Sequence, residues 1–284
     1  MKKLKISVMF FAATAFAATT FTSCTQEEDV QPVEELEITD EIMSQFTELG
    51  FDVSDIETVK QPTLGGGEES GFMLEGDIFI AQENFRKMLD SKVAHEGAVG
   101  EQYRTNNLVS SSNYTIDIIG YTANNSNGLD NTMQTALQWA VANYNRLNIG
   151  LNFRLTFGTN YQSKDMVVYR VGGGGGGSAG FPSSGRPYKW VQIQSGTSSF
   201  GTNVVEHVIT HEIGHSVGLR HTDYFNRSIS CGSGGNEGSG GVGAIHIPNT
   251  PTSADMNSIM LACFSSSEDG EFGNFDVVAL EFLY

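Results

Sequence analysis

Apolar residues recur at helical spacing in two long stretches of the second half of the chain. From Met133 to Leu147 they lie three and four positions apart, which predicts an amphipathic helix. A second helix is predicted through Val204 to Val217, with Asn203 as its N-cap, and a short third helix from about Phe275 to Tyr284. Runs rich in β-branched and aromatic residues predict strands at 114–121, 153–157, 166–171 and 189–194.

The first part of the chain shows a weaker pattern. Residues 25–60 hold twelve acidic side chains and one lysine, so we expect residues 24–70 to form a solvated, flexible tether. Phe72–Ile80 is strand-like and leads into a helical stretch from Ala81 to about Ala94. We therefore expect a small accessory segment at 71–112 and the main domain at 113–284.

The N-terminus has the pattern of an export signal. Lys2, Lys3 and Lys5 precede a short apolar run from Ile6 to Ala18, and small residues follow. A buried core helix would show polar residues at helical spacing, which this run lacks. Phe21-Thr22-Ser23-Cys24 resembles a bacterial lipoprotein box, which implies a signal peptide at 1–23 and a lipid on Cys24. Ordinary cleavage and secretion is the alternative, because Phe21 departs from the usual residue of that box.

Charge and the remaining cysteines narrow the picture. The net charge of −17 would repel a phosphate backbone, so we expect no nucleic-acid partner. In an exported chain, Cys231 and Cys263 are predicted to form one disulfide. Two free buried thiols are the alternative, and neither cysteine has the C-x-x-C spacing of a metal site.

The candidate chemistry lies at the end of the predicted central helix. His211 and His215 are four residues apart, so both imidazoles project from one helical face and can hold one metal ion. Glu212 can act as general base toward a metal-bound water. Gly218 can end the helix with a left-handed backbone, and His221 then returns as a third ligand. Three nitrogen ligands leave a fourth position open, as in catalytic zinc sites.

The other histidines are interpreted as non-ligands. His207 lies one turn before His211 and is expected at the surface or behind the ligands, and His95 and His246 lie in other parts of the chain. The glycine run 172–177 is interpreted as flexible chain. It is not a phosphate loop, because it lacks the terminal Lys and Ser/Thr of that motif.

These residues resemble the metzincins, and within them the bacterial metallopeptidases with the run His-Glu-Ile-Gly-His, here His211 to His215. The resemblance implies an α+β fold: a twisted, mostly parallel sheet, a zinc-binding helix and a turn whose methionine packs beneath the metal. Ser258-Ile259-Met260 is similar to that turn. Ala262 stands where astacin-like relatives have a tyrosine ligand, so no fifth ligand is expected. Thr222 after the third histidine indicates a separate subgroup.

The resemblance also implies how substrate is bound and how the enzyme is controlled. An edge strand would pair with extended peptide, and Lys189–Gln194, with Lys189, Trp190, Val191 and Gln192, is the candidate. The segment before the main domain resembles a propeptide. A carboxylate such as Asp77 could occupy the open metal position, or Asp77 could be only a turn residue.

The sequence therefore predicts a zinc-dependent endopeptidase that acts on extracellular proteins, with one catalytic zinc ion and a polypeptide substrate. We expect a monomer that associates with a membrane only through a lipid anchor, either retained at the outer membrane or cell surface or released. The acidic loops leave open whether calcium is bound, and no feature supports it. Two alternatives are a surface lipoprotein that binds protein or glycan and keeps a structural metal, and a zinc hydrolase of non-peptide amides.

Overall fold

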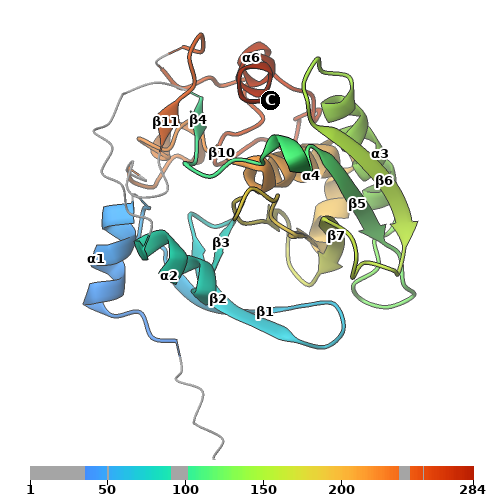
Figure 1. The fold of residues 1–284 in the computed structure, drawn as a ribbon, viewed down its shortest axis with the longest axis horizontal. Helices are drawn as coiled ribbons and strands as arrows, with labels where there is room; N and C mark the ends of the chain where they lie inside the picture. The colour runs from blue at the N-terminus through green and yellow to red at the C-terminus, as the bar shows by residue number, and fades with distance from the viewer. Residues whose placement is uncertain (1–35, 50, 91–101, 237–243, 252) are drawn as a thin grey trace, which may run out of the picture. The chain divides into compact units, whose positions relative to one another are not determined.

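The computed structural model describes residues 36–284 apart from 50, 91–101, 237–243 and 252 (Figure 1). The predicted signal peptide, Cys24, the start of the predicted tether and His95 lie outside the described residues. Across the part that is described, none of the helices combines the length and apolar character that crossing a membrane requires.

A five-stranded sheet forms the centre of the fold, in the order β6-β5-β7-β9-β8. The first four strands are parallel, and β8 pairs antiparallel with β9. In register, Ile118 of β5 lies opposite Leu155 of β6 and Met166 of β7. The strands span Thr115–Tyr121 (β5), Asn152–Gly158 (β6), Met166–Val171 (β7), Gly177–Ser178 (β8) and Trp190–Gln194 (β9). The predicted mostly parallel sheet is confirmed.

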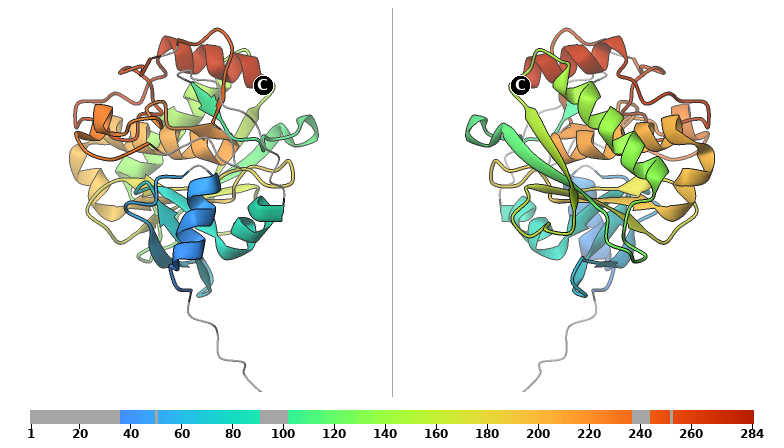
Figure 2. Two further views of the ribbon diagram at one scale, coloured as in Figure 1. Left: turned by 90° about the vertical axis from the view of Figure 1, so that its left-hand side faces the viewer. Right: turned by 90° about the vertical axis from the view of Figure 1, so that its right-hand side faces the viewer.

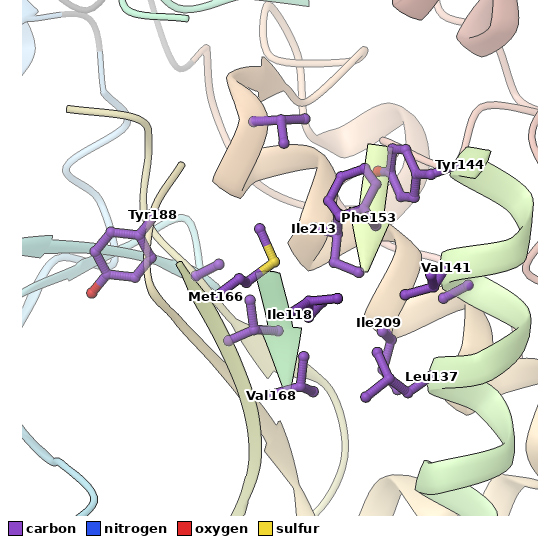
Figure 3. Packing of buried hydrophobic residues seen from close by; sticks show 14 of the residues in the cluster. Ile118, Leu137, Val141, Tyr144, Phe153, Met166, Val168, Tyr188, Ile209 and Ile213 are labelled. Carbon is purple, nitrogen blue, oxygen red and sulfur yellow. The ribbon is translucent and has the colours of Figure 1, made fainter. Parts of the chain in front are cut away.

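Two helices, α3 (Asn131–Asn145) and α4 (Thr202–Val217), pack together against the sheet, as the sequence predicts. Asp130 caps α3 by accepting a hydrogen bond from the Met133 amide at 2.9 Å. The predicted cap of α4 is wrong, because Gly201 occupies the N-cap and Asn203 already lies inside the helix. Figure 3 shows the apolar faces of the sheet and both helices meeting, with Ile118 and Ile213 among the fully buried residues. This cluster, centred on the sheet and both helices, is called the main core below.

The described part of the chain before the main domain is folded, and the prediction of a flexible tether is wrong for residues 36–70. Its elements are α1 (Asp40–Leu49), β1 (Glu57–Pro62), β2 (Glu68–Leu74), β3 (Ile78–Ala81) and α2 (Gln82–Asp90). The three strands form an antiparallel sheet in the order β1-β2-β3. Acidic composition misleads here because Phe46, Leu49 and Phe72 still provide enough apolar surface for a buried cluster. We call the described residues of 36–90 the covering segment.

The predicted single strand at Phe72–Ile80 is instead a hairpin. β2 and β3 are joined by the loop Glu75-Gly76-Asp77, in which Glu75 and Gly76 have φ values of 58° and 89°. Such left-handed residues reverse the chain within a short loop. This hairpin loop reaches the site described below. Figure 2 shows α1 and α2 at the side of the molecule opposite to α6 (Asn274–Leu283), the helix that confirms the predicted C-terminal one.

The remaining elements are short and surround the end of α4. A small sheet has the order β10-β4-β11, and its strands are Leu219–Arg220 (β10), Tyr103–Arg104 (β4) and Ile245–His246 (β11). A short helix, α5 (Ser228–Cys231), follows, and two 3-10 helices span Ser111–Asn113 and Ser195–Phe200. The rest of the described chain after α4 is mostly irregular, so loops rather than strands surround the third histidine.

Candidate active site

Helix α4 carries the first two histidines into the interior of the protein. All its residues from Val204 to Val217 are buried, so the helix has no solvent-facing side. Gly218 ends it in the left-handed conformation, with φ 109°, as predicted. The chain turns there, and His221 comes back toward the helix. The three imidazole rings lie 4.6, 4.8 and 5.3 Å apart between centroids.

Backbone carbonyls orient the first two rings. His211 Nδ1 lies 2.8 Å from the carbonyl oxygen of Ile259, and His215 Nδ1 lies 2.9 Å from that of Leu219. A carbonyl can only accept, so each Nδ1 carries the proton and donates it. The lone pair is then on Nε2, which points into the site. The structure therefore sets the tautomer that a metal ligand needs.

The nitrogen atoms inside the site fit a metal ion better than they fit each other. His215 Nε2 and His221 Nε2 are 3.2 Å apart, and His211 Nε2 is buried without a hydrogen-bond partner among the described residues. Together with one oxygen of Asp77, ligand atoms of the three histidines lie within 4.8 Å of one another. Converging imidazole nitrogens in a buried site suit zinc, which prefers nitrogen donors and tetrahedral geometry. Burial, followed by the neighbouring histidines, holds the pKa of His215 well below its usual range, so this ring is neutral, as a ligand must be.

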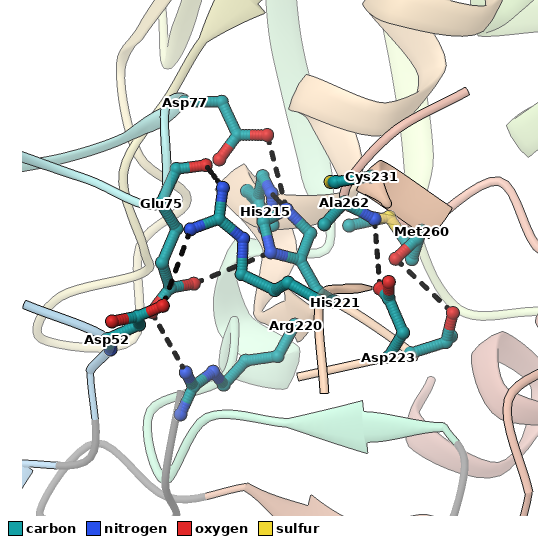
Figure 4. A network of polar contacts seen from close by, with 12 residues as sticks. Asp52, Glu75, Asp77, His215, Arg220, His221, Asp223, Cys231, Met260 and Ala262 are labelled. Atoms are coloured by element: carbon teal, nitrogen blue, oxygen red, sulfur yellow. Dashed lines mark hydrogen bonds and ion pairs between the residues drawn. The ribbon is translucent and has the colours of Figure 1, made fainter. Parts of the chain in front are cut away.

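Asp77 lies at the site rather than in a distant turn (Figure 4). Its Oδ2 is 3.2 Å from His221 Nε2 and 3.4 Å from His211 Nε2. Burial by itself would raise the pKa of Asp77, but the adjacent histidines, His221 first, lower it well below its usual range. The hairpin loop of the covering segment thus places a carboxylate oxygen against the face where the histidine nitrogens converge.

Glu212 follows the first histidine and is 2% exposed. Burial, together with the nearby Asp77 carboxylate, raises the pKa of Glu212 well above its usual range. One of its oxygens, Oε2, has no hydrogen-bond partner among the described residues. The carboxylate fits only because residue 177 is glycine: a Cβ there would lie 2.8 Å from Glu212 Oε1. The side chain is therefore held between α4 and β8 in a proton-binding state.

Met260 is fully buried and in contact with α4. A Cβ on Gly214 would be 2.5 Å from the Met260 sulfur, so the helix and the methionine approach as closely as a glycine allows. Asp276 of α6 fixes the preceding turn by accepting from Ser258 Oγ at 2.6 Å and from the Ile259 amide at 2.8 Å. Sequence reasoning missed Asp276, because an acidic residue in a short C-terminal helix has no spacing relation to the turn it anchors.

The third histidine has a different environment, which sequence reasoning also missed. His221 Nδ1 lies 3.4 Å from Glu75 Oε2 of the hairpin loop. The other oxygen of Glu75 lies 3.6 Å from the guanidinium of Arg220, which is fully buried and stacks on the rings of Phe51 and Tyr224. Figure 4 shows Glu75 between Arg220 and His221. The Leu-Arg-His run places Arg220 next to a candidate ligand, but its partner lies 145 positions earlier in the chain.

The predicted edge strand is wrong. β9, which contains Trp190 to Gln192, lies inside the sheet between β7 and β8, and Lys189 lies just before it. The outermost strand is β8, at the end of the glycine run 172–177, where no apolar alternation could reveal a strand. The covering segment continues the ladder at this edge: the Phe79 amide donates to Ala179 O at 2.8 Å, and the Ala179 amide donates to Asp77 O at 3.1 Å. This pairing is parallel.

The predicted disulfide is present between Cys231 and Cys263. It joins α5 to the chain that follows Met260. Asp223 strengthens the same junction by accepting from the Ala262 amide at 3.0 Å and from Ser230 Oγ at 2.6 Å. The loop after the third histidine and the loop after Met260 therefore form one cross-linked wall beside the site.

Two other histidines lie apart from the cluster. His207 is buried, and its ring packs 4.4 Å from that of Phe264. Burial, followed by the charge of His211, lowers the pKa of His207 to about 3. His246 Nε2 lies 3.1 Å from Thr250 Oγ1 in the small sheet. Both are non-ligands by position, as the sequence analysis expects.

A protein-family match agrees with this geometry. The sequence profile of a family described as dual-action HEIGH metallo-peptidase matches residues 72–284, a range that includes both the hairpin loop and α4. Two solved structures of myroilysin are similar at 13% and 12% identity, with TM-scores of 0.36 and 0.38. Those alignments cover 71% and 69% of this chain and 95% and 91% of the other. No curated protein sequence matches significantly.

Proposed function

Because the chain belongs to the dual-action HEIGH metallopeptidase family, we propose that it is a zinc-dependent endopeptidase that hydrolyses peptide bonds of extracellular proteins. The family makes it a peptidase. The single observation that supports the catalytic assignment best is the buried set of three imidazoles with Glu212 beside it. A structural site would not need an adjacent buried carboxylate that fills no ligand position.

His211, His215 and His221 would hold the ion through their Nε2 atoms. Zinc, when bound, would supply Lewis acidity that polarises the scissile carbonyl and activates a water for attack. Glu212 accepts the proton of the attacking water on its carboxylate and later delivers it to the leaving amine. Its position suits this role, because it follows the first ligand on α4, is buried and stands outside the ligand set.

We also propose that the covering segment keeps the enzyme latent, with Asp77 as the inhibitory ligand. Asp77 lies against His211 and His221, and the covering segment pairs with the edge strand of the sheet in the parallel direction. A peptide substrate of a metzincin pairs antiparallel, so the segment crosses the site in the reverse sense. A reversed chain presents no scissile bond in the orientation that Glu212 and the metal can use.

The decisive experiment uses the zinc-loaded full chain carrying Asp77→Ala, with casein as substrate. Cleavage should be abolished by a zinc chelator and should fall about 10³-fold or more in the Glu212→Gln double variant, as for loss of a general base. Glu281→Gln, an exposed substitution on α6, is the matched control and should leave the rate unchanged. A folded, zinc-loaded Asp77→Ala protein that cleaves neither casein nor a peptide library would contradict the proposal.

Latency is tested by comparing the unsubstituted chain with Asp77→Ala and with Asp40→Ala, an exposed residue of the same segment. We expect at least a tenfold faster initial rate for Asp77→Ala and no change for Asp40→Ala, with equal zinc content. Equal rates in all three proteins would show that Asp77 does not control access.

One observation favours the alternative of a binding protein with a structural metal: Asp77 would close the coordination sphere with a fourth protein ligand. That reading requires Asp77 to stabilise the fold. It predicts that Asp77→Ala loses zinc and lowers the melting temperature without any gain of cleavage, the opposite of the expectation for a latent enzyme.

Export as a lipoprotein remains part of the proposal, supported by Lys2, Lys3 and Lys5, the apolar run and the box ending at Cys24. Mass spectrometry of the N-terminal peptide from a bacterial membrane fraction tests it. A lipid-sized mass increase on Cys24, absent in Cys24→Ser, is expected, whereas a free mature N-terminus in the medium would indicate ordinary secretion.

A further inference from the structure

Next to the proposed metal site, the structure places an arginine whose charge the proposed chemistry does not use. We propose that Arg227 forms a substrate subsite that selects peptides with an acidic side chain close to the cleaved bond. This inference rests on the proposed function and names the substrate class of the same site. It comes from how the covering segment occupies the space that a substrate would need.

Arg227 lines a pocket at the site. His211 and Glu212, the stretch from Ala262 to Phe264 and the hairpin loop Glu75–Asp77 line it as well. Arg227 is 8% exposed. It is followed immediately by α5, whose disulfide to Cys263 fixes this wall of the pocket. The guanidinium therefore lines the same pocket as the candidate general base, where a group that enters the pocket can reach it.

The covering segment gives this guanidinium acidic and carbonyl partners. Nη1 of Arg227 lies 3.2 Å from Asp55 Oδ2 and 3.8 Å from Asp52 Oδ2. Nη2 donates to the carbonyl oxygen of Glu75 at 2.8 Å. A planar guanidinium matches such a set of oxygens, and it stays charged when buried. Carboxylates of the covering segment therefore occupy the space around Arg227.

The charge of the two regions agrees with this interpretation. Residues 36–90 contain thirteen acidic and three basic side chains, whereas residues 102–284 contain thirteen acidic and nine basic ones. Lysines and arginines of the main domain are mostly exposed or half-buried, but Arg220 and Arg227 are buried and both lie beneath the hairpin loop. The strongest excess of negative charge thus lies in the part of the chain that covers the site.

Displacement of the covering segment would remove these partners from a buried cation. The vacated guanidinium would then face the pocket, where a carboxylate can form a charge-assisted, bidentate contact that an amide cannot, so a ligand that brings a carboxylate is favoured. The carbonyl that Arg227 contacts belongs to Glu75, two residues before Asp77 at the metal position. Since an extended chain advances about 3.3–3.6 Å per residue, the selected side chain should lie within about two residues of the scissile bond.

The test uses an opened form of the full chain with Asp52→Asn, Asp55→Asn and Asp77→Ala, which removes the covering carboxylates while keeping every residue of the main domain. Peptide pairs differ only by Glu or Gln at one position near the cleaved bond. Binding is measured by fluorescence anisotropy in a zinc-loaded Glu212→Gln version, and cleavage rates in the version that retains Glu212. Melting temperature and zinc content verify that each variant is folded.

We expect the Glu peptide to bind at least tenfold more tightly than the Gln peptide. Arg227→Gln should reduce this ratio to within twofold, and Arg227→Glu should reverse the preference toward a Lys peptide. Arg186→Gln, an exposed arginine of the main domain, should leave the ratio unchanged. The ratio is the readout because looser docking of the segment affects both peptides equally.

A Glu-to-Gln binding ratio near one, or a preference that survives Arg227→Gln, would overturn the inference and leave the peptidase proposal standing. A binding preference that depends on Arg227, found in proteins that retain Glu212 but cleave no peptide, would support the inference and refute the proposed catalysis. The two failures are therefore distinguishable.

Discussion

The two largest hydrophobic clusters of the described residues differ in what they hold together. The main core joins the parallel sheet to α3 and α4, and nearly all of its members are residues of the chain after position 102. The cluster of the covering segment consists of residues from 36–90 and one outside ring, Phe181. Aromatic pairs dominate it, with Phe46 stacked on Phe85 at 4.2 Å and edge-on to Phe72 at 4.9 Å.

Strand β3 contributes side chains to both clusters. Ile78 and Ile80 face the cluster of the covering segment, whereas Phe79 and Ala81 face the main core, because side chains alternate along a strand. The other contacts near the site are polar: Asp77 with the histidines and Glu75 with Arg220. Apolar contacts attach the segment as well, because Leu64 packs with Val167 and Tyr169 of the central sheet. Most of its buried apolar residues still meet in a cluster of their own, so we expect the segment to unfold as a unit while the main core stays intact, as a removable inhibitor requires.

Phe46→Ala tests whether the two clusters unfold separately and has the largest expected effect. Removing a fully buried phenylalanine costs about 3–5 kcal/mol, and the loss should fall on the covering segment alone. Calorimetry should then show an early transition for the segment and an unchanged one for the main core, with faster peptide cleavage. Phe282→Ala, which removes an exposed ring, should change neither. A single transition that shifts as a whole would mean that the two clusters unfold as one.

Gly214→Ala tests the opposite region with a smaller expected effect. The new Cβ would lie 2.5 Å from the buried Met260 sulfur, and overpacking of this kind costs about 1–3 kcal/mol. The transition of the main core should move to lower temperature, and zinc should dissociate more readily in a chelator competition. Gly172→Ala, where a Cβ meets nothing within 4 Å, is the matched control. Unchanged zinc retention would show that Met260 does not support the histidines.

Glu206→Gln should have the smallest effect, and one that depends on pH. Burial, followed by the charge of Glu271, raises the pKa of Glu206 from 4.5 to about 7. The folded protein therefore holds this proton more tightly than the unfolded chain, so the unsubstituted protein loses stability as pH rises from about 4.5 to about 7. At pH 8 the variant should melt about 2–4 °C higher, and at pH 4 the two should coincide.

The matched control for that titration is Glu281→Gln, since Glu281 is exposed on α6. Its melting temperature should follow that of the unsubstituted protein at every pH. Because Glu206 lies on α4 and not in the covering segment, only the transition of the main core should respond. If the melting temperature of the early transition changed with pH instead, the titrating group would lie in the covering segment, and the assignment to Glu206 would be wrong.

Local patterns predicted the elements that carry the chemistry. The helix through His211 and His215, its end at Gly218 and the strands β5, β6 and β7 all follow from periodicity and from residues within one or two turns of each other. The disulfide could be inferred because only two cysteines remained after the N-terminal one. These features depend on interactions between near neighbours or on simple counting.

Tertiary structure alone decided what approaches the site. Asp77 reaches His221 across 144 positions, Arg227 reaches the carbonyl of Glu75 across 152, and Asp276 of α6 accepts from Ser258 Oγ in the turn before Met260. The acidic composition before residue 70 indicated a flexible tether, yet its scattered phenylalanines meet in one cluster. Periodicity shows which side of an element is buried, but it cannot show which distant surface covers that side, because that choice depends on the packing of the whole chain.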